Sequence, residues 1–112
     1  MSGDDWQTPD WLRQLIAPNS FDPCPNGGTE GLTEPWPTDR TVFINPPYSD
    51  PGPWVKRAAA HSGRVVLLLK DDPSTAWYDY AEFFEVIHIG QRIRFKGASR
   101  SPNFASCVWR KP

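Results

Sequence analysis

The residues with the clearest chemical potential are four consecutive ones, Asn45-Pro46-Pro47-Tyr48, which follow the apolar, β-branched run Thr41–Ile44. Two prolines fix successive φ angles at about −65° and remove two N–H donors. The Pro46 carbonyl and the Asn45 side-chain oxygen can therefore act as two rigid acceptors for one planar amino group, such as the exocyclic amino group of adenine. This geometry holds the nitrogen lone pair toward a methyl donor, and Tyr48 offers a flat ring on which a base can stack.

The tetrapeptide must be positioned by the surrounding helices and strands. The order of helical and strand patterns along the sequence predicts an α/β fold with a mainly parallel sheet that ends in an antiparallel hairpin. Thr8 is expected as the N-cap of a first helix, whose Trp11, Leu12, Leu15 and Ile16 recur at helical spacing. Further helices are predicted around Trp54–Ala59 and after Asp72-Pro73, and residues 22–39 are predicted to be a long loop. The expected strands are Thr41–Ile44, Arg64–Leu69, Phe84–Ile89, and Arg92–Phe95 paired with Phe104–Trp109.

Length and composition predict one domain over residues 1–112. The chain has 13 Pro and 8 Gly, which favour turns, but also 13% aromatic residues, which are enough for a compact core. The longest aliphatic run, Val65–Leu69, is far shorter than the roughly 20 residues of a membrane span, and no leader pattern opens the chain. We therefore expect a cytoplasmic protein with no membrane contact, in which Cys24 and Cys107 are free thiols. No Cys/His pair shows zinc-ligand spacing, so no metal is expected.

Charge is distributed unevenly along the chain, although the formal net charge is only −1. Residues 1–39 are strongly acidic, whereas residues 86–112 hold basic residues and no acid: Arg92, Arg94, Lys96, Arg100, Arg110 and Lys111. Clustered cations attract phosphate groups, and they also occur on ordinary solvated surfaces. The segment Arg92–Arg100 is thus a candidate surface for contacting nucleic acid.

Nearly the whole sequence resembles the phage-encoded, Dam-type DNA N6-adenine methyltransferases, which depend on S-adenosyl-L-methionine. The tetrapeptide alone indicates only a planar amino group as substrate, whereas the ordered set of segments is more specific. The segments are Trp6-Gln7-Thr8-Pro9, Phe21-Asp22-Pro23-Cys24, Gly31-Leu32 with Trp36, Val42 to Tyr48, Trp54-Val55-Lys56, Val65–Leu69 and Gly90–Phe95. The resemblance implies a trimmed Rossmann-like methyltransferase fold and methyl transfer to the N6 nitrogen of adenine in double- or single-stranded DNA.

The resemblance also implies roles for individual residues. Asn45, Pro46, Pro47 and Tyr48 are the expected catalytic group. The expected cofactor-binding residues are Gln7, Thr8 and Pro9 at the methionine end, Asp22 at the position where the first strand of the family ends, the nearby Cys24, and Glu30 near the adenosine. The expected DNA contacts are Arg92, Arg94, Lys96 and Arg100. Transfer needs no covalent intermediate, so neither cysteine is required as a nucleophile.

One departure from the family pattern concerns the cofactor region. Only 18 residues separate Asp22 from Thr41, too few for a helix plus a second strand with their turns. The cofactor site is therefore expected to be reduced to a loop. The same chemistry on RNA or on a protein glutamine amide, a homodimer that completes the site, and an inactive nucleic-acid-binding relative remain alternatives.

The basic segment generates the first prediction. Replacing one phosphate-contacting residue, Arg94→Ala, is expected to weaken DNA binding and to reduce the slope of log affinity against log salt by about 1, because one fewer counterion is released. Titrating labelled DNA at several salt concentrations measures this slope. An unchanged slope would remove this segment from the interface.

Overall fold

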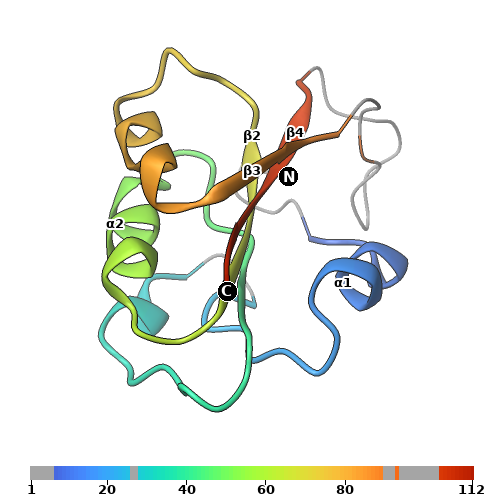
Figure 1. Ribbon diagram of the computed structural model, residues 1–112, viewed down its shortest axis with the longest axis vertical. Coiled ribbons are helices and arrows are strands. Elements are labelled where there is room, and N and C mark those ends of the chain that lie inside the picture. Colours follow the sequence, from blue (N-terminus) through green and yellow to red (C-terminus); the bar gives the residue numbers. More distant parts are fainter. Residues whose placement is uncertain (1–6, 26–27, 90–92, 94–103) are drawn as a thin grey trace.

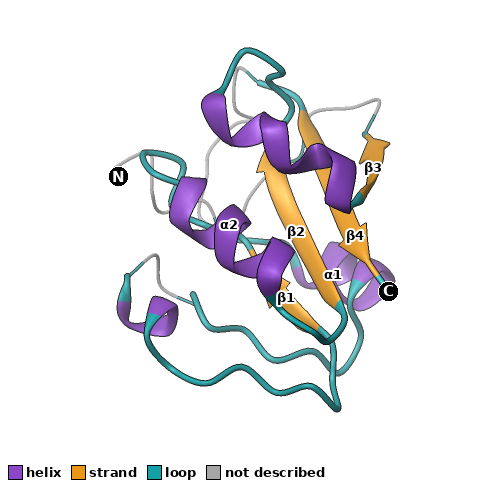
Figure 2. Ribbon diagram, turned by 60° about the vertical axis from the view of Figure 1, so that its left-hand side comes forward, coloured by secondary structure: helices purple, strands orange, loops and turns teal. Residues whose placement is uncertain are grey.

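The computed structural model describes residues 7–25, 28–89, 93 and 104–112, and it contains a four-stranded sheet with helical segments on both faces (Figures 1 and 2). The elements in chain order are α1 (Asp10–Ile16), the 3-10 helix η1 (Glu30–Leu32), β1 (Val42–Ile44), α2 (Gly52–Ala60), β2 (Val65–Lys70), the 3-10 helix η2 (Ala76–Phe83), β3 (Glu85–His88) and β4 (Ser106–Lys111). The α/β prediction is therefore confirmed.

The sheet is mixed, so the prediction of a mainly parallel sheet was wrong. The strand order is β1-β2-β4-β3, in which β1 and β2 are parallel and β4 is antiparallel to both of its neighbours. The cause is the last strand, which inserts between β2 and β3 instead of lying at an edge. A single parallel bridge between Phe21 and Val42 extends the sheet beyond β1.

The predicted hairpin between Arg92–Phe95 and Phe104–Trp109 lies largely outside the described residues, because only Ile93 of its first segment is described. The second segment contains most of β4. Over Cys107–Trp109, one edge of β4 pairs with β2 and the other with β3. The last strand is therefore an interior strand of the sheet.

Two helical predictions needed correction. Pro9, not Thr8, is the N-cap of α1, because the extended ψ of Pro9 places its carbonyl to accept the Leu12 and Arg13 N–H groups. Only part of the expected apolar face is buried: Leu12 is 5% exposed, while Trp11 is 65% and Leu15 74% exposed. The helix after Asp72-Pro73 begins at Ala76 and is a 3-10 helix.

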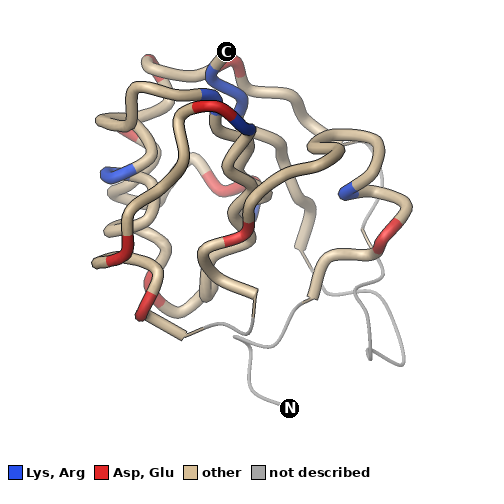
Figure 3. Tube along the Cα trace, turned by 90° about the horizontal axis from the view of Figure 1, so that it is seen from below, with Lys and Arg blue, Asp and Glu red and all other residues tan. Residues whose placement is uncertain are grey.

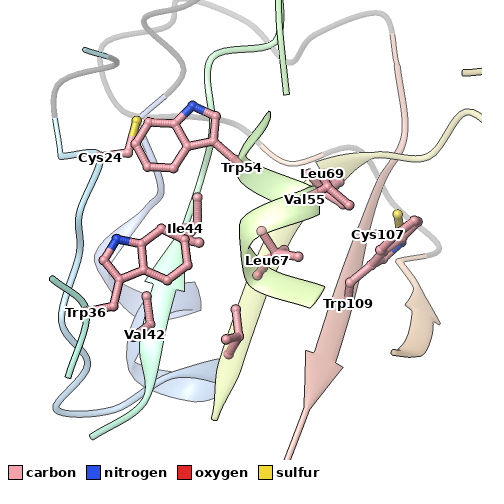
Figure 4. Close-up of a cluster of buried hydrophobic side chains, with 12 residues drawn as sticks. Cys24, Trp36, Val42, Ile44, Trp54, Val55, Leu67, Leu69, Cys107 and Trp109 are labelled. Carbon is pink, nitrogen blue, oxygen red and sulfur yellow. The ribbon is translucent and has the colours of Figure 1, made fainter. Parts of the chain in front are cut away.

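The buried residues form two clusters, one on each face of the sheet. Under α2, η1 and η2, odd-numbered residues of β2 pack with Trp36, Trp54 and Trp109 (Figure 4). On the face toward α1, Val66 and Leu68 pack with Phe43, Leu12 and Ile93. The near-continuous apolar sequence of β2 is explained by burial on both faces. None of the helices in the described ranges is long and apolar enough to cross a membrane.

Lys111 connects the last strand to α2. Its ammonium group donates hydrogen bonds to the carbonyls of Ala58 (2.8 Å), Ala59 (3.1 Å) and His61 at the carboxyl end of that helix. The last carbonyls of a helix lack the usual partner four residues further on, although the Ala58 carbonyl also accepts the His61 N–H (3.2 Å). A cation there also interacts favourably with the helix dipole. Lys111 therefore fixes α2 against β4.

This contact predicts that Lys111→Met lowers the free energy of unfolding by about 1–3 kcal/mol, the range for hydrogen bonds to charged groups. Urea denaturation monitored by circular dichroism measures the change. The matched control is Arg110→Met, which removes an exposed ion pair with Glu85 at 2.9 Å and is expected to cost less than about 1 kcal/mol. Equal losses for the two variants would contradict the assigned role of Lys111.

Candidate active site

The candidate site forms where the parallel segments of the sheet end. Phe21 donates its N–H to the Thr41 carbonyl (2.9 Å), and its own carbonyl accepts the Phe43 N–H (2.8 Å). Val42 in turn pairs with Val65 of β2. Phe21, β1 and β2 therefore run in the same direction, and the residues that follow them lie at one edge of the sheet, the usual location of ligand sites in open α/β folds.

The tetrapeptide Asn45–Tyr48 leaves the carboxyl end of β1, as predicted. Pro46 and Pro47 are buried, whereas Asn45 and Tyr48 are partly exposed. The Asp50 N–H donates to the Pro47 carbonyl (3.1 Å), which closes a turn directly after the tetrapeptide. The backbone is thus rigid at this point and then turns into α2.

Tyr48 lies between the core and a surface cleft. Its ring contacts Phe104 edge to face, with 5.1 Å between centroids. Burial raises the pKa of its hydroxyl well above the ordinary range, with Ser106 opposing the shift. Tyr48 is therefore neutral at physiological pH, so it offers an uncharged ring and cannot act as a base.

The cleft has a volume of about 700 Å³ and lies between the tetrapeptide turn, α2 and η2. Its lining includes Tyr48, Asp50, Lys56, Trp77 and Tyr80. A recess of about 100 Å³ shares Tyr48 and Trp77 with the cleft and reaches Leu69 and Lys70 at the end of β2. The cleft thus presents aromatic rings next to the tetrapeptide.

A second cavity, of about 480 Å³, brings together three of the predicted cofactor residues, Asp22, Cys24 and Glu30. Glu34 adds another carboxylate, and Gly28 and Gly31 contribute backbone to the wall. A cavity of this size with several acidic side chains is suited to a cationic small molecule. We refer to it as the acidic cavity.

Asp22 is held in the acidic cavity by contacts from two directions. One oxygen accepts the Cys24 backbone N–H (2.8 Å), and the other lies 3.8 Å from the Arg13 guanidinium. The side chain is only 15% exposed, and burial raises the pKa of the carboxyl although both contacts oppose the shift. A cation bound next to this carboxylate would therefore offset the free-energy cost of burying its charge.

The remaining predicted cofactor residues do not line the acidic cavity. Gln7, Thr8 and Pro9 lie at the start of α1, one turn before Arg13, which contacts Asp22. The Thr8 hydroxyl is buried and has no hydrogen-bond partner among the described residues.

Cys24, which does line the acidic cavity, is 4% exposed. Its thiol lies 3.5 Å from the Gly28 carbonyl, so Cys24 helps to shape the cavity wall.

The four predicted DNA contacts, Arg92, Arg94, Lys96 and Arg100, lie outside the described residues. Of the other two basic residues near the C-terminus, Arg110 pairs with Glu85 and Lys111 binds α2. Acidic and basic positions are interspersed over the chain drawn in Figure 3. In that part of the chain, no group of three or more His, Cys, Asp or Glu side chains is placed to hold a metal ion.

Some lining residues were missed by the sequence analysis. Lys56, Trp77 and Tyr80 have no functional role in the sequence-based predictions, although all three line the cleft. A usable signal was present, because η2 follows the carboxyl end of β2 and therefore returns to the same edge as the tetrapeptide. Trp36, one of the residues that carry the resemblance, is buried at 7% exposure.

Comparison with known proteins bears on the same residues. The family model for DNA N-6-adenine-methyltransferase (Dam) matches residues 26–107, a range that includes the tetrapeptide, the cleft and part of the acidic cavity. The chain belongs to the Dam family. Its sequence is 46% identical over 52 residues to the DNA N-6-adenine-methyltransferase of Haemophilus phage HP1, and 39% identical over 56 residues to that of Escherichia phage T1.

These two matches cover 43% and 47% of this chain, but only 30% and 24% of the respective relatives. The chain thus spans less than a third of the length of either phage protein. The region matched by the Dam family model includes the tetrapeptide and the cleft, whereas Asp22 and Cys24 of the acidic cavity lie before it.

The burial of Asp22 predicts opposite effects on stability and ligand binding. Asp22→Asn keeps an oxygen for the Cys24 N–H but removes a desolvated charge, so the melting temperature is expected to stay the same or rise. If the acidic cavity holds the S-adenosyl-L-methionine that the resemblance implies, the affinity for it is expected to fall about tenfold or more, because a charge-assisted contact is lost. Calorimetry for unfolding and for binding measures the two quantities. A lower melting temperature with unchanged affinity would show that Asp22 is only structural.

Proposed function

We propose that this chain is an S-adenosyl-L-methionine-dependent methyltransferase that methylates the N6 amino nitrogen of adenine in DNA. The single observation that carries the proposal is the placement of Asn45–Tyr48 at the sheet edge where residues lining both cavities emerge. Family membership and the names of the two phage relatives support the same activity.

The acidic cavity fits the cofactor in size and charge. When bound, S-adenosyl-L-methionine supplies an electrophilic methyl group on a positively charged sulfur, and it carries a cationic amino group. Asp22 and Glu30 provide carboxylates for these charges, and the Cys24 backbone helps to hold Asp22 in place. A trimmed Rossmann-like fold is consistent with this placement, since Asp22 follows the strand position beside β1.

The tetrapeptide binds and orients the substrate amino group. In this proposal, the Asn45 side-chain oxygen and the Pro46 carbonyl accept its two hydrogens, so that the nitrogen lone pair points at the methyl group. Such positioning and preorganised electrostatics supply the rate enhancement, and no nucleophilic side chain takes part. The proton lost after methylation passes to solvent, so no strong base is needed.

The aromatic cleft is proposed to receive the adenine. Tyr48, Trp77 and Tyr80 offer rings against which an unstacked base can pack, each such contact being worth about 1–3 kcal/mol. A base can reach the cleft from single-stranded DNA or by flipping out of a duplex, which costs a few kcal/mol. The phage origin of both relatives supports, as part of this proposal, a location in the cytoplasm of a bacterial host.

The test is a transfer assay with radiolabelled cofactor and unmethylated DNA, followed by digestion to nucleosides. Label in N6-methyldeoxyadenosine is expected. Parallel incubations with RNA and with protein distinguish the alternatives that use the same chemistry. Binding of DNA without binding of cofactor would indicate an inactive relative instead.

The proposed role of Asn45 predicts the effect of its removal. Asn45→Ala is expected to lower the transfer rate by at least about 100-fold, while cofactor affinity stays within a few fold, because only the amino-group acceptor is lost. Gln14→Ala, which removes an exposed amide on α1, is the matched control and is expected to retain activity. Normal methylation by Asn45→Ala would exclude the tetrapeptide as the active site.

A further inference from the structure

A partly buried contact network joins α2 to the wall of the acidic cavity. The Arg57 guanidinium donates to three backbone carbonyls, those of Gly31 (2.8 Å), Leu32 (2.6 Å) and Glu34 (2.5 Å). All three belong to η1 or to the residues directly after it, and Gly31 and Glu34 line the acidic cavity. Arg57 itself is absent from the lining, so its contacts reach the wall from behind.

Trp36 holds the guanidinium in place. The guanidinium carbon lies 4.1 Å from the centroid of the Trp36 ring, within the range of a cation–π interaction. The Trp36 indole N–H also donates to the Gly31 carbonyl (2.9 Å), and its ring stacks on Trp54 of α2. Figure 4 shows both indoles on the same side of β1, with Cys24 next to Trp54. The wall is therefore attached to α2 through two side chains.

The wall has few hydrogen bonds of its own. In η1, the Leu32 N–H donates to Thr29 (3.1 Å) and the Thr33 N–H to Glu30 (3.2 Å). A single 3-10 turn is not stable by itself in water. Gly31 must also fit closely against Pro23, since a Cβ atom there would lie 1.9 Å from the Pro23 carbonyl oxygen. The wall thus depends on external contacts to keep its shape.

From these contacts we infer that Arg57 is a positioning residue for the cofactor, because it holds the wall of the acidic cavity in shape. The short segment after Asp22 cannot form the helix and strand that would otherwise support this wall. This inference rests on the proposed function. The neighbouring residue, Lys56, lines the aromatic cleft instead. Consecutive residues of α2 therefore serve the two cavities, and Arg57 acts on the cofactor side alone.

The test compares Arg57→Ala and Arg57→Lys with the unsubstituted chain. Lysine keeps the charge but cannot bridge three carbonyls or stack as a plane on Trp36. We expect the dissociation constant and the KM for S-adenosyl-L-methionine to rise about tenfold or more in Arg57→Ala and less in Arg57→Lys. The KM for DNA and kcat at saturating cofactor are expected to stay within about twofold. Arg64→Ala, which removes an exposed arginine that contacts Thr41, is the matched control.

Hydrogen exchange supplies a readout that does not depend on activity. The Leu32 and Thr33 amides are expected to exchange faster in Arg57→Ala, whereas the β2 amides keep their protection because the fold is intact. Unchanged cofactor affinity in the folded variant, or unchanged exchange of these two amides, would overturn the inference. A merely structural role would lower kcat with the fraction folded and leave KM unchanged.

These outcomes also separate the inference from the proposed function. If the unsubstituted chain binds and uses the cofactor but Arg57→Ala does so equally well, only the role of Arg57 is wrong. If the unsubstituted chain neither binds the cofactor nor transfers a methyl group, the proposed function fails and the cofactor role of Arg57 fails with it.

Discussion

The parallel pairing of Phe21 with β1, and of β1 with β2, is the constraint on which the site depends. Only a few backbone hydrogen bonds make this pairing, including Phe21 to Thr41 (2.9 Å) and Val42 to Arg64 (3.0 Å). Because the three segments run in one direction, Asp22, Asn45 and the residues after β2 emerge at the same edge. An antiparallel arrangement would place the acid and the tetrapeptide at opposite ends of the sheet.

The short chain replaces regular structure with side-chain contacts. Between Asp22 and Thr41, the described residues contain a single 3-10 turn as regular structure. Arg57 and Trp36 tie that turn to α2, and Lys111 ties the carboxyl end of α2 to β4. α2 is thus the common support of the acidic cavity and the aromatic cleft. The planar guanidinium suits this task because it can bridge several carbonyls at once while it packs on a ring.

The sequence predicted the features that depend on local chemistry. The apolar run of β2 and the β-branched run before Asn45 identified the parallel pair, and the resemblance grouped Asp22, Cys24 and Glu30, which do line one cavity. Features that depend on long-range pairing were missed. Nothing near Cys107–Trp109 indicates that this strand inserts between β2 and β3, so the mixed sheet was not predicted. Trp11, Leu12 and Leu15 all follow a helical period, but which side of the helix is buried depends on the element that packs against it. Of these three residues, only Leu12 is buried. The three hydrogen bonds from Arg57 to backbone carbonyls join residues about 25 positions apart. No periodic pattern in the sequence indicates such contacts.

The electrostatics of the two cavities differ in a way that suits transfer of a methyl group from a cationic donor to a neutral base. In the acidic cavity, burial raises the pKa of Asp22, so its carboxylate is held at a cost in stability that a bound cation can offset. In the cleft, burial raises the pKa of the Tyr48 hydroxyl, so this ring stays uncharged, and the charges on the lining come from Asp50 and Lys56. In the proposed reaction the donor loses its positive charge on transfer, so the acidic cavity is expected to bind the thioether product less favourably than the sulfonium. The carboxylates proposed to hold the donor are thus also expected to favour release of its product.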